Sequence, residues 1–141
     1  MGELPRSRIL IAGLENPGPL TRKALDYAQT MQRLLPGAKE PNDWAPLEAF
    51  VAVDEFERVG TFLEVQNWKQ YTEMLTQWAS ATSRFEMTPR RVSELPGLVY
   101  LEIEERHFRG INADVVNSMT VFEFDVAGKI RHLDVYLQHP R

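Results

Sequence analysis

The stretch VFEFDVAGKIRHLDVYLQ, residues 121–138, contains two segments in which apolar and polar side chains alternate, separated by the turn-like sequence VAGK. Side chains of a β-strand point alternately to the two faces of a sheet, so each segment is typical of a strand with one buried face. In the last segment Leu133, Val135 and Leu137 share one face, and more polar residues stand between them. We therefore predict a β-hairpin whose apolar face lies on the core.

The same alternation continues upstream of this hairpin. Residues 114–125 form its first strand, and residues 98–108 and 84–95 are predicted to be the two strands before it. Pro89 interrupts the earliest of these, which favours a bulge or an edge position because proline has no N–H for the ladder. The carboxyl-terminal part of the chain is therefore predicted to be an antiparallel sheet.

The register of these strands follows from the faces of their side chains. Residues paired across a ladder share a face, and placing Thr120 opposite both Ile103 and Val135 brings the less polar sets together. The inner face then carries these residues: Ser118, Thr120, Phe122, Leu133, Val135 and Leu137. Glu102, Glu104 and Arg106 fall on the outer face, which needs no active site to explain its charges.

Three helices are predicted before the run of strands. Apolar residues recur at three- and four-residue spacing over 19–35, and Pro36 and Gly37 end that helix. A short second helix runs through Phe50, capped by Asn42 or Asp43. A third helix, over 68–81, begins after the cap residue Asn67.

Residues 54–62 alternate and end near Gly60, so a further strand is expected between the second and third helices. Helices followed by a run of strands indicate an α+β fold. We predict one domain over residues 19–141, preceded by an N-terminal arm, residues 1–18.

Composition excludes several classes of function. The chain has 141 residues, a net charge of −4 and no cysteine. The acidic balance argues against a nucleic-acid partner, and the lack of cysteine excludes disulfides and thiolate chemistry. No apolar run approaches the ~20 residues of a membrane span. We expect a cytoplasmic protein that is not membrane-bound, and we predict no metal site and no cofactor.

Three segments resemble the nuclear transport factor 2-like superfamily, and more specifically its SnoaL-like branch of small bacterial proteins. They are EAFVAVDEFERVG at 48–60, the helix ending TQWA at 76–79, and the hairpin at 121–138; the resemblance covers about residues 20–138. It implies a cone in which three helices pack in a strongly curved antiparallel sheet, with a ligand cavity inside and frequent dimerisation.

Two catalytic sets known in this superfamily are not preserved. Ketosteroid isomerases use an aspartate base, a tyrosine and a protonated aspartate; the resemblance puts Arg58, Tyr27 and Thr120 there, and the Tyr27 match is loose. Limonene epoxide hydrolases use an Asp–Arg–Asp triad with a tyrosine and an asparagine. The aligned residues here are Val135, Ile103, Glu105, Phe56 and Arg58, so only the carboxylate of Glu105 survives.

The remaining candidates for chemistry are Arg58, Glu105 and His107. Arg58 is either an inward cation for an anionic ligand or a surface residue. Glu105 and His107 have inward parity and form either an acid/base pair or a frayed strand end. An apolar cavity would favour the neutral carboxyl of Glu105, whereas a nearby Arg58 would hold it ionised.

We predict that the cavity binds a small hydrophobic or aromatic molecule with a polar end, with isomerase-, hydrolase- or cyclase-type chemistry as an open possibility. The expected ligand contacts are Tyr27, Phe56, Trp68, Ser118, Thr120, Phe122, Leu133, Val135 and Leu137. Trp68, Tyr71 and Trp78 form either an aromatic wall or plain helix packing.

The alternative is a non-enzymatic interaction module that uses the outer sheet face. Tyr136, Met119 and Val121 offer an apolar island there among charged residues. We also predict a homodimer through this face, because its charge pattern is self-complementary.

Overall fold

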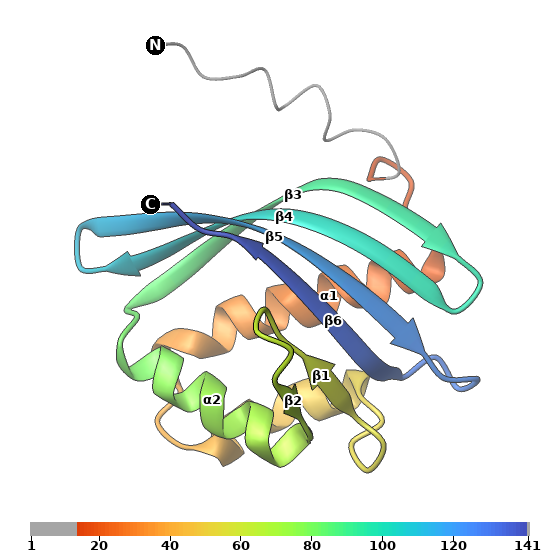
Figure 1. The fold of residues 1–141 in the computed structure, drawn as a ribbon, viewed down its shortest axis with the longest axis horizontal. Helices are drawn as coiled ribbons and strands as arrows, with labels where there is room; N and C mark the ends of the chain where they lie inside the picture. The colour runs from red at the N-terminus through yellow and green to blue at the C-terminus, as the bar shows by residue number, and fades with distance from the viewer. Residues whose placement is uncertain (1–13, 141) are drawn as a thin grey trace.

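The computed structural model describes residues 14–140, in which helices cover the inner face of one curved sheet (Figure 1). The helical elements are α1 (Pro19–Leu34), the 3₁₀ helices η2 (Leu35–Gly37) and η3 (Pro41–Phe50), and α2 (Trp68–Ser80). The strands are β1 (Glu57–Val59), β2 (Val65–Gln66), β3 (Arg84–Leu95), β4 (Leu98–Arg109), β5 (Asn112–Phe124) and β6 (Ile130–Gln138). The predicted α+β fold is confirmed; most of the predicted arm, residues 1–18, lies outside the described residues.

The sheet has the strand order β2-β1-β6-β5-β4-β3 and is mixed rather than wholly antiparallel. The last four strands form antiparallel hairpins as predicted, but β1 pairs parallel with β6, with Arg58 beside Leu133. The strand predicted over 54–62 is shorter, because the chain turns at Gly60 and returns as β2.

The register is confirmed on one side of β5 and displaced on the other. Thr120 pairs with Val135, as predicted, whereas Ile103 pairs with Ser118 instead of Thr120. The displacement arises because β4 and β5 are joined by a turn tighter than expected, in which Gly110 takes a positive φ of 64°. A shift of two residues keeps every side chain on its predicted face.

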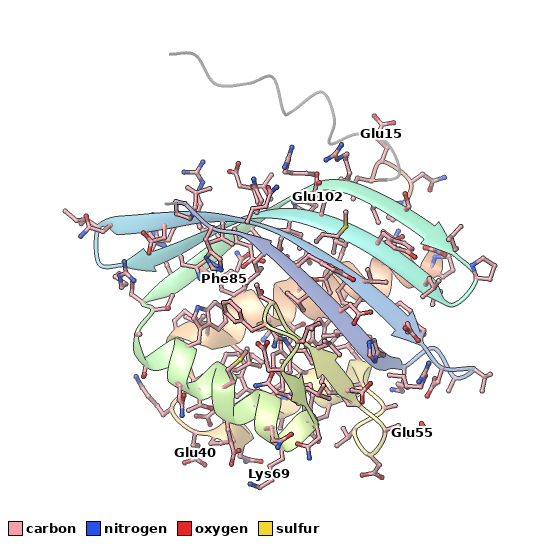
Figure 2. The ribbon with its side chains drawn as sticks, viewed as in Figure 1. Glu15, Glu40, Glu55, Lys69, Phe85 and Glu102 are labelled. Carbon is pink, nitrogen blue, oxygen red and sulfur yellow. The ribbon has the colours of Figure 1, made fainter. Side chains whose placement is uncertain are left out.

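The edge strand β3 behaves as Pro89 indicated. Its ladder with β4 shifts register between Pro89 and Arg91, and no strand lies on its other side among the described residues. The outer and inner faces are visible in Figure 2, where Glu102 and Phe85 lie on opposite sides of the sheet.

A carboxylate from the sheet caps α1. The N-cap residue, Gly18, has no side chain, and Glu94 of β3 accepts hydrogen bonds from the Thr21 N–H (2.8 Å) and hydroxyl (2.7 Å). A Cβ at Gly18 would lie 2.6 Å from the Glu94 carboxylate, so glycine leaves the space for this contact. The cap therefore anchors the helix to the sheet.

The second helix differs from the prediction in its type and its cap. Residues 41–50 form a 3₁₀ helix that contains Pro46, which lacks an N–H for helical bonding. Its N-cap is Glu40, and Asp43 stands at the third helical position, where it accepts from the Glu40 N–H at 3.1 Å. Asn42 makes no side-chain hydrogen bond within residues 14–140.

The third helix begins as predicted. Asn67 accepts from the Gln70 N–H, and Gln70 accepts from the Asn67 N–H, both at 2.9 Å. Within residues 14–140, no helix combines the length and the apolar character needed to cross a membrane.

We expect Asn67→Ala to lower the free energy of unfolding by about 1 kcal/mol, because it removes a capping acceptor from the N-terminus of α2. Asn42→Ala is the matched control and should change stability by less than about 0.5 kcal/mol. Urea denaturation followed by circular dichroism measures both. Equal losses in the two variants would contradict the assigned caps.

Candidate functional site

A cavity of about 790 Å³ lies between the helices and the inner face of the sheet. Most of the residues predicted for the site line it. The polar ones are Tyr27, Arg58, Glu105, His107, Ser118 and Thr120, and the apolar ones are Phe122, Leu133, Val135 and Leu137. A volume of this size is typical of small-molecule sites.

Two of the predicted ligand contacts do not line the cavity. Phe56 and Trp68 are buried and pack against each other, with ring centroids 5.0 Å apart. Phe56 also stacks on Tyr71 at 5.7 Å, and Tyr71 does line the cavity. The three aromatic residues of α2 therefore differ in role. Trp68 serves packing, while Tyr71 and Trp78 form part of the cavity wall.

Sequence reasoning did not single out the methionines of the lining. Met31 on α1, Met74 on α2 and Met87 on β3 all contribute to the wall. Their inward positions follow the helical and strand periods, but those periods alone do not separate a core position from a cavity position. Methionine is flexible and polarizable, so this part of the wall can adapt to different apolar shapes.

A chain of hydrogen bonds runs along one wall of the cavity through His107 and Glu105. The Trp78 Nε1–H donates to His107 Nδ1 at 3.1 Å, and His107 Nε2 lies 2.8 Å from Glu105 Oε1. The Ser118 hydroxyl donates to the other carboxylate oxygen at 2.5 Å. Both oxygens of Glu105 thus have protein partners.

Trp78 determines the tautomer of His107 in this chain. An indole N–H can only donate, so His107 Nδ1 must be the acceptor and the neutral ring carries its proton on Nε2. That proton points at Glu105. His107 therefore orients the carboxylate, and both side chains line the cavity.

Arg58 is an inward cation, which decides between the two alternatives for this residue. It is 7% exposed and lines the cavity, with its guanidinium 5.1 Å from the centre of the Tyr71 ring. Nη1 donates to Gln66 Oε1 at 3.0 Å and lies 3.7 Å from Glu64 Oε2. Nε is buried and has no hydrogen-bond partner within residues 14–140.

The predicted proximity of Arg58 and Glu105 does not produce an ion pair. The carboxylate beside Arg58 is Glu64, whereas Glu105 is held by His107 and Ser118. Sequence reasoning missed Glu64 because it ended the strand near Gly60 without predicting that the chain returns beside this strand as β2. Gly60 was the available signal, since a glycine that ends a short strand marks a turn that brings the chain back on itself.

The Tyr27 hydroxyl is a second polar group near Arg58, and it lies beside Tyr71. It is buried within the cavity wall. Burial raises the pKa of Tyr27 well above its ordinary value; the nearby Tyr71 adds to this and Arg58 opposes it. Burial likewise raises the pKa of Tyr71, against the effect of Arg58. Both phenols therefore remain protonated and can act as O–H donors.

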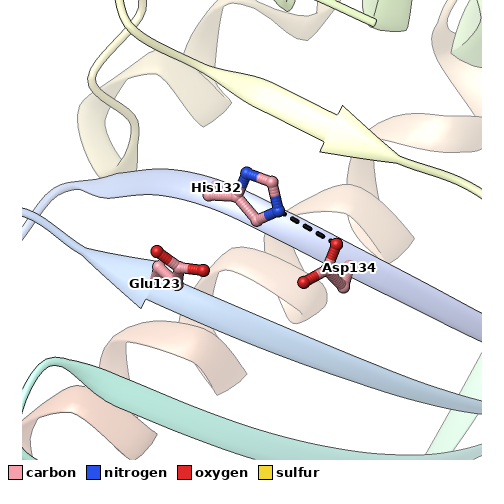
Figure 3. Close-up of side chains that lie close together, drawn as sticks. All are labelled: Glu123, His132 and Asp134. Carbon is pink, nitrogen blue, oxygen red and sulfur yellow. Dashed lines mark hydrogen bonds and ion pairs between the residues drawn. The ribbon is translucent and has the colours of Figure 1, made fainter. Parts of the chain in front are cut away.

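The outer face carries a group of side chains that the sequence did not suggest. Glu123, His132 and Asp134 offer ligand atoms within 4.8 Å of one another (Figure 3). Each already has a protein partner: His132 contacts Asp134 at 2.9 Å and Glu57 at 3.0 Å, and Glu123 pairs with Arg131 at 2.7 Å. The group is a network of polar contacts that links β1, β5 and β6.

The predicted outer apolar island is present beside this network. Met119 pairs with Tyr136, which is 60% exposed, and Val121 pairs with Tyr100 on the next strand. The homodimer predicted through this face stays a prediction.

No family model matches the sequence, and no curated protein matches it either. Solved structures do. A protein from Shewanella denitrificans OS-217 assigned as a SnoaL-like polyketide cyclase superposes with a TM-score of 0.70 at 11% identity, covering 87% of this chain and 92% of that one. An NTF2-like protein from Anabaena variabilis ATCC 29413 gives a TM-score of 0.68 at 13% identity, covering 84% and 89%.

An LEH-like epoxide hydrolase from M. tuberculosis gives a TM-score of 0.61 at 17% identity, covering 85% of this chain and 86% of that one. Identities this low establish the fold alone. The resemblance seen in the sequence is thus confirmed at the level of architecture: the chain has the nuclear transport factor 2-like fold.

Proposed function

We propose that this protein binds a small, largely apolar or aromatic molecule with an anionic or other oxygen-bearing end, and that Glu105 exchanges a proton with it. The observation that carries the proposal is the buried donor Arg58 Nε, which has no acceptor within residues 14–140 and lies in the cavity near the Tyr27 hydroxyl. A buried donor without an acceptor costs free energy, and a ligand oxygen would supply the acceptor.

The apolar body of the ligand would lie against the aromatic and methionine side chains of the wall. Tyr71 and Trp78 supply flat surfaces, and Met31, Met74 and Met87 supply adaptable ones. Pockets that combine a mostly apolar lining with a few polar groups orient a ligand by those groups. Arg58 and Tyr27 would therefore hold one end while Glu105 faces another part of the molecule.

Glu105 has the features of a general base. Its carboxylate lines the cavity, Ser118 and His107 fix its orientation, and Trp78 fixes His107 in turn. Proton transfer by a positioned carboxylate belongs to the isomerase, hydrolase and cyclase reactions expected on this fold. The structural neighbours include proteins assigned as a polyketide cyclase and as an epoxide hydrolase, which supports chemistry of this kind.

Two dyes test the anion site. Anilinonaphthalene sulfonate and phenylnaphthylamine share a ring system, and only the first carries a negative charge. We expect Arg58→Met to weaken the sulfonate at least about tenfold, because a charge-assisted hydrogen bond is lost. The affinity for phenylnaphthylamine should change by less than about twofold. Fluorescence titration measures both affinities.

If Arg58 served packing alone, Arg58→Met would change the affinities for the two dyes equally. Unchanged affinity for the sulfonate would remove Arg58 from the site.

The elimination of nitrobenzisoxazole tests Glu105 as a base. The carboxylate takes the ring C–H proton, the electron pair forms a nitrile, and the N–O bond breaks to give a coloured phenolate. We expect Glu105→Gln, which keeps the shape of the side chain, to lower the rate within the cavity about a hundredfold. Absorbance of the phenolate follows the reaction.

The matched control is Glu104→Gln. Glu104 precedes Glu105 in β4, faces the outer side and contacts Arg106 at 3.2 Å. Its substitution should leave the rate within about twofold of the wild type. If the two variants behave alike, Glu105 is not the base.

The second candidate is an interaction surface on the outer face, favoured by the exposure of Tyr136 beside Met119. A protein pairing with its own copy there should show twice the 16.3 kDa mass of the chain in light scattering at micromolar concentration. Tyr136→Asp should return it to the single-chain mass, because it places a charge in an apolar contact. A monomeric wild type would refute the homodimer.

A further inference from the structure

We propose that Glu64 is a specificity-determining residue: its carboxylate lies beside Arg58 and partly neutralises the guanidinium, so an anionic ligand must compete with it. This inference rests on the proposed function, in which the cavity binds a ligand through Arg58. It predicts that the site discriminates among anions by how well they compete with a carboxylate of the protein itself.

The contact between Glu64 and Arg58 is suited to displacement. Glu64 Oε2 lies 3.7 Å from Arg58 Nη1, beyond hydrogen-bond distance, and Nη1 has its hydrogen bond with Gln66 instead. The Glu64 side chain is 40% exposed. It can therefore turn towards water when the anion of a ligand supplies the negative charge beside the buried Arg58.

Gly60 provides the space in which the two groups meet. A Cβ at this position would lie 2.1 Å from Glu64 Oε2 and 2.7 Å from Arg58 Nη1. Any other residue would separate the carboxylate from the guanidinium. The close approach of Glu64 to Arg58 is thus a property of this turn and of the glycine that begins it.

The turn itself lies at the rim of the cavity. Thr61, Phe62 and Glu64 line the cavity, although Phe62 is 86% exposed. Leu63, at the tip, is 80% exposed and has a positive φ of 63°, which is uncommon for a leucine. The second oxygen of Glu64 accepts from the Phe62 N–H at 2.9 Å, so the carboxylate also belongs to the turn.

An anion with two or more oxygens can bind Arg58 more strongly than Glu64 does. Glu64 approaches only Nη1, and Nε has no acceptor within residues 14–140. A carboxylate or sulfonate on the ligand could accept from Nε and Nη2 together, the side-on pair through which arginine binds such groups most strongly. A ligand with a single weak acceptor would bind only one of these two donors. The inferred ligand class is therefore an aromatic or alicyclic molecule with a carboxylate or sulfonate-like group.

Titration of Glu64→Gln with the two dyes tests the inference. Glutamine keeps the shape and removes the competing charge, so anilinonaphthalene sulfonate should bind about fivefold more tightly. Phenylnaphthylamine should stay within about twofold of its wild-type affinity, so that the ratio of the two affinities changes. If Glu64 had only a structural role, its substitution would change the affinities for both dyes by the same factor.

Glu57→Gln is the matched control. Glu57 lies next to Arg58 in β1 but contacts His132 on the outer face, at 3.0 Å. Removing its charge should change the binding of the sulfonate by less than about twofold. An equal gain in both variants would show a general effect of charge and overturn the inference.

The outcomes separate this inference from the proposed function. If Arg58→Met weakens binding of the sulfonate and Glu64→Gln does not strengthen it, Glu64 does not compete with the ligand, but the anion site at Arg58 is supported. If Arg58→Met binds the sulfonate as the wild type does, the anion site and the competition are both wrong.

Discussion

Three residues of β1, Glu57–Val59, pair parallel with His132–Asp134 of β6. This short ladder determines which face of the sheet each side chain of β1 takes. It turns Arg58 into the cavity and leaves Glu57 outside, where His132 holds it. A slip of one residue would exchange the two faces and place a carboxylate in the cavity instead of a guanidinium. The polar contacts of the outer face therefore support the position of a cation on the inner face.

The cavity combines an apolar wall with two polar groups of different character. The Arg58 end offers donors, with Nε unbonded within residues 14–140 and the Tyr27 hydroxyl nearby. The Glu105 end offers an acceptor whose oxygens are oriented by Ser118 and His107. A ligand that accepts at one end and yields a proton at the other would use both, which is why we connect anion binding and proton transfer in one proposal.

Alternation along the strands was enough to predict most of this architecture. It placed the last strand at residues 130–138 and put Glu105, Ser118 and Thr120 on the inner face, because strand periodicity is a local property. Neither the parallel pairing of β1 with β6 nor the bond between Trp78 and His107 could be predicted. Each depends on a contact between side chains or strands brought together only by the complete fold, and neither leaves a periodic pattern.

A crystal structure of the protein with anilinonaphthalene sulfonate tests the central claim most directly, namely that the cavity binds an amphipathic molecule through Arg58. We expect the rings in the cavity and sulfonate oxygens at about 3 Å from Arg58 Nε and Nη2. Dye bound outside the cavity, or inside it with the sulfonate away from Arg58, would contradict the account.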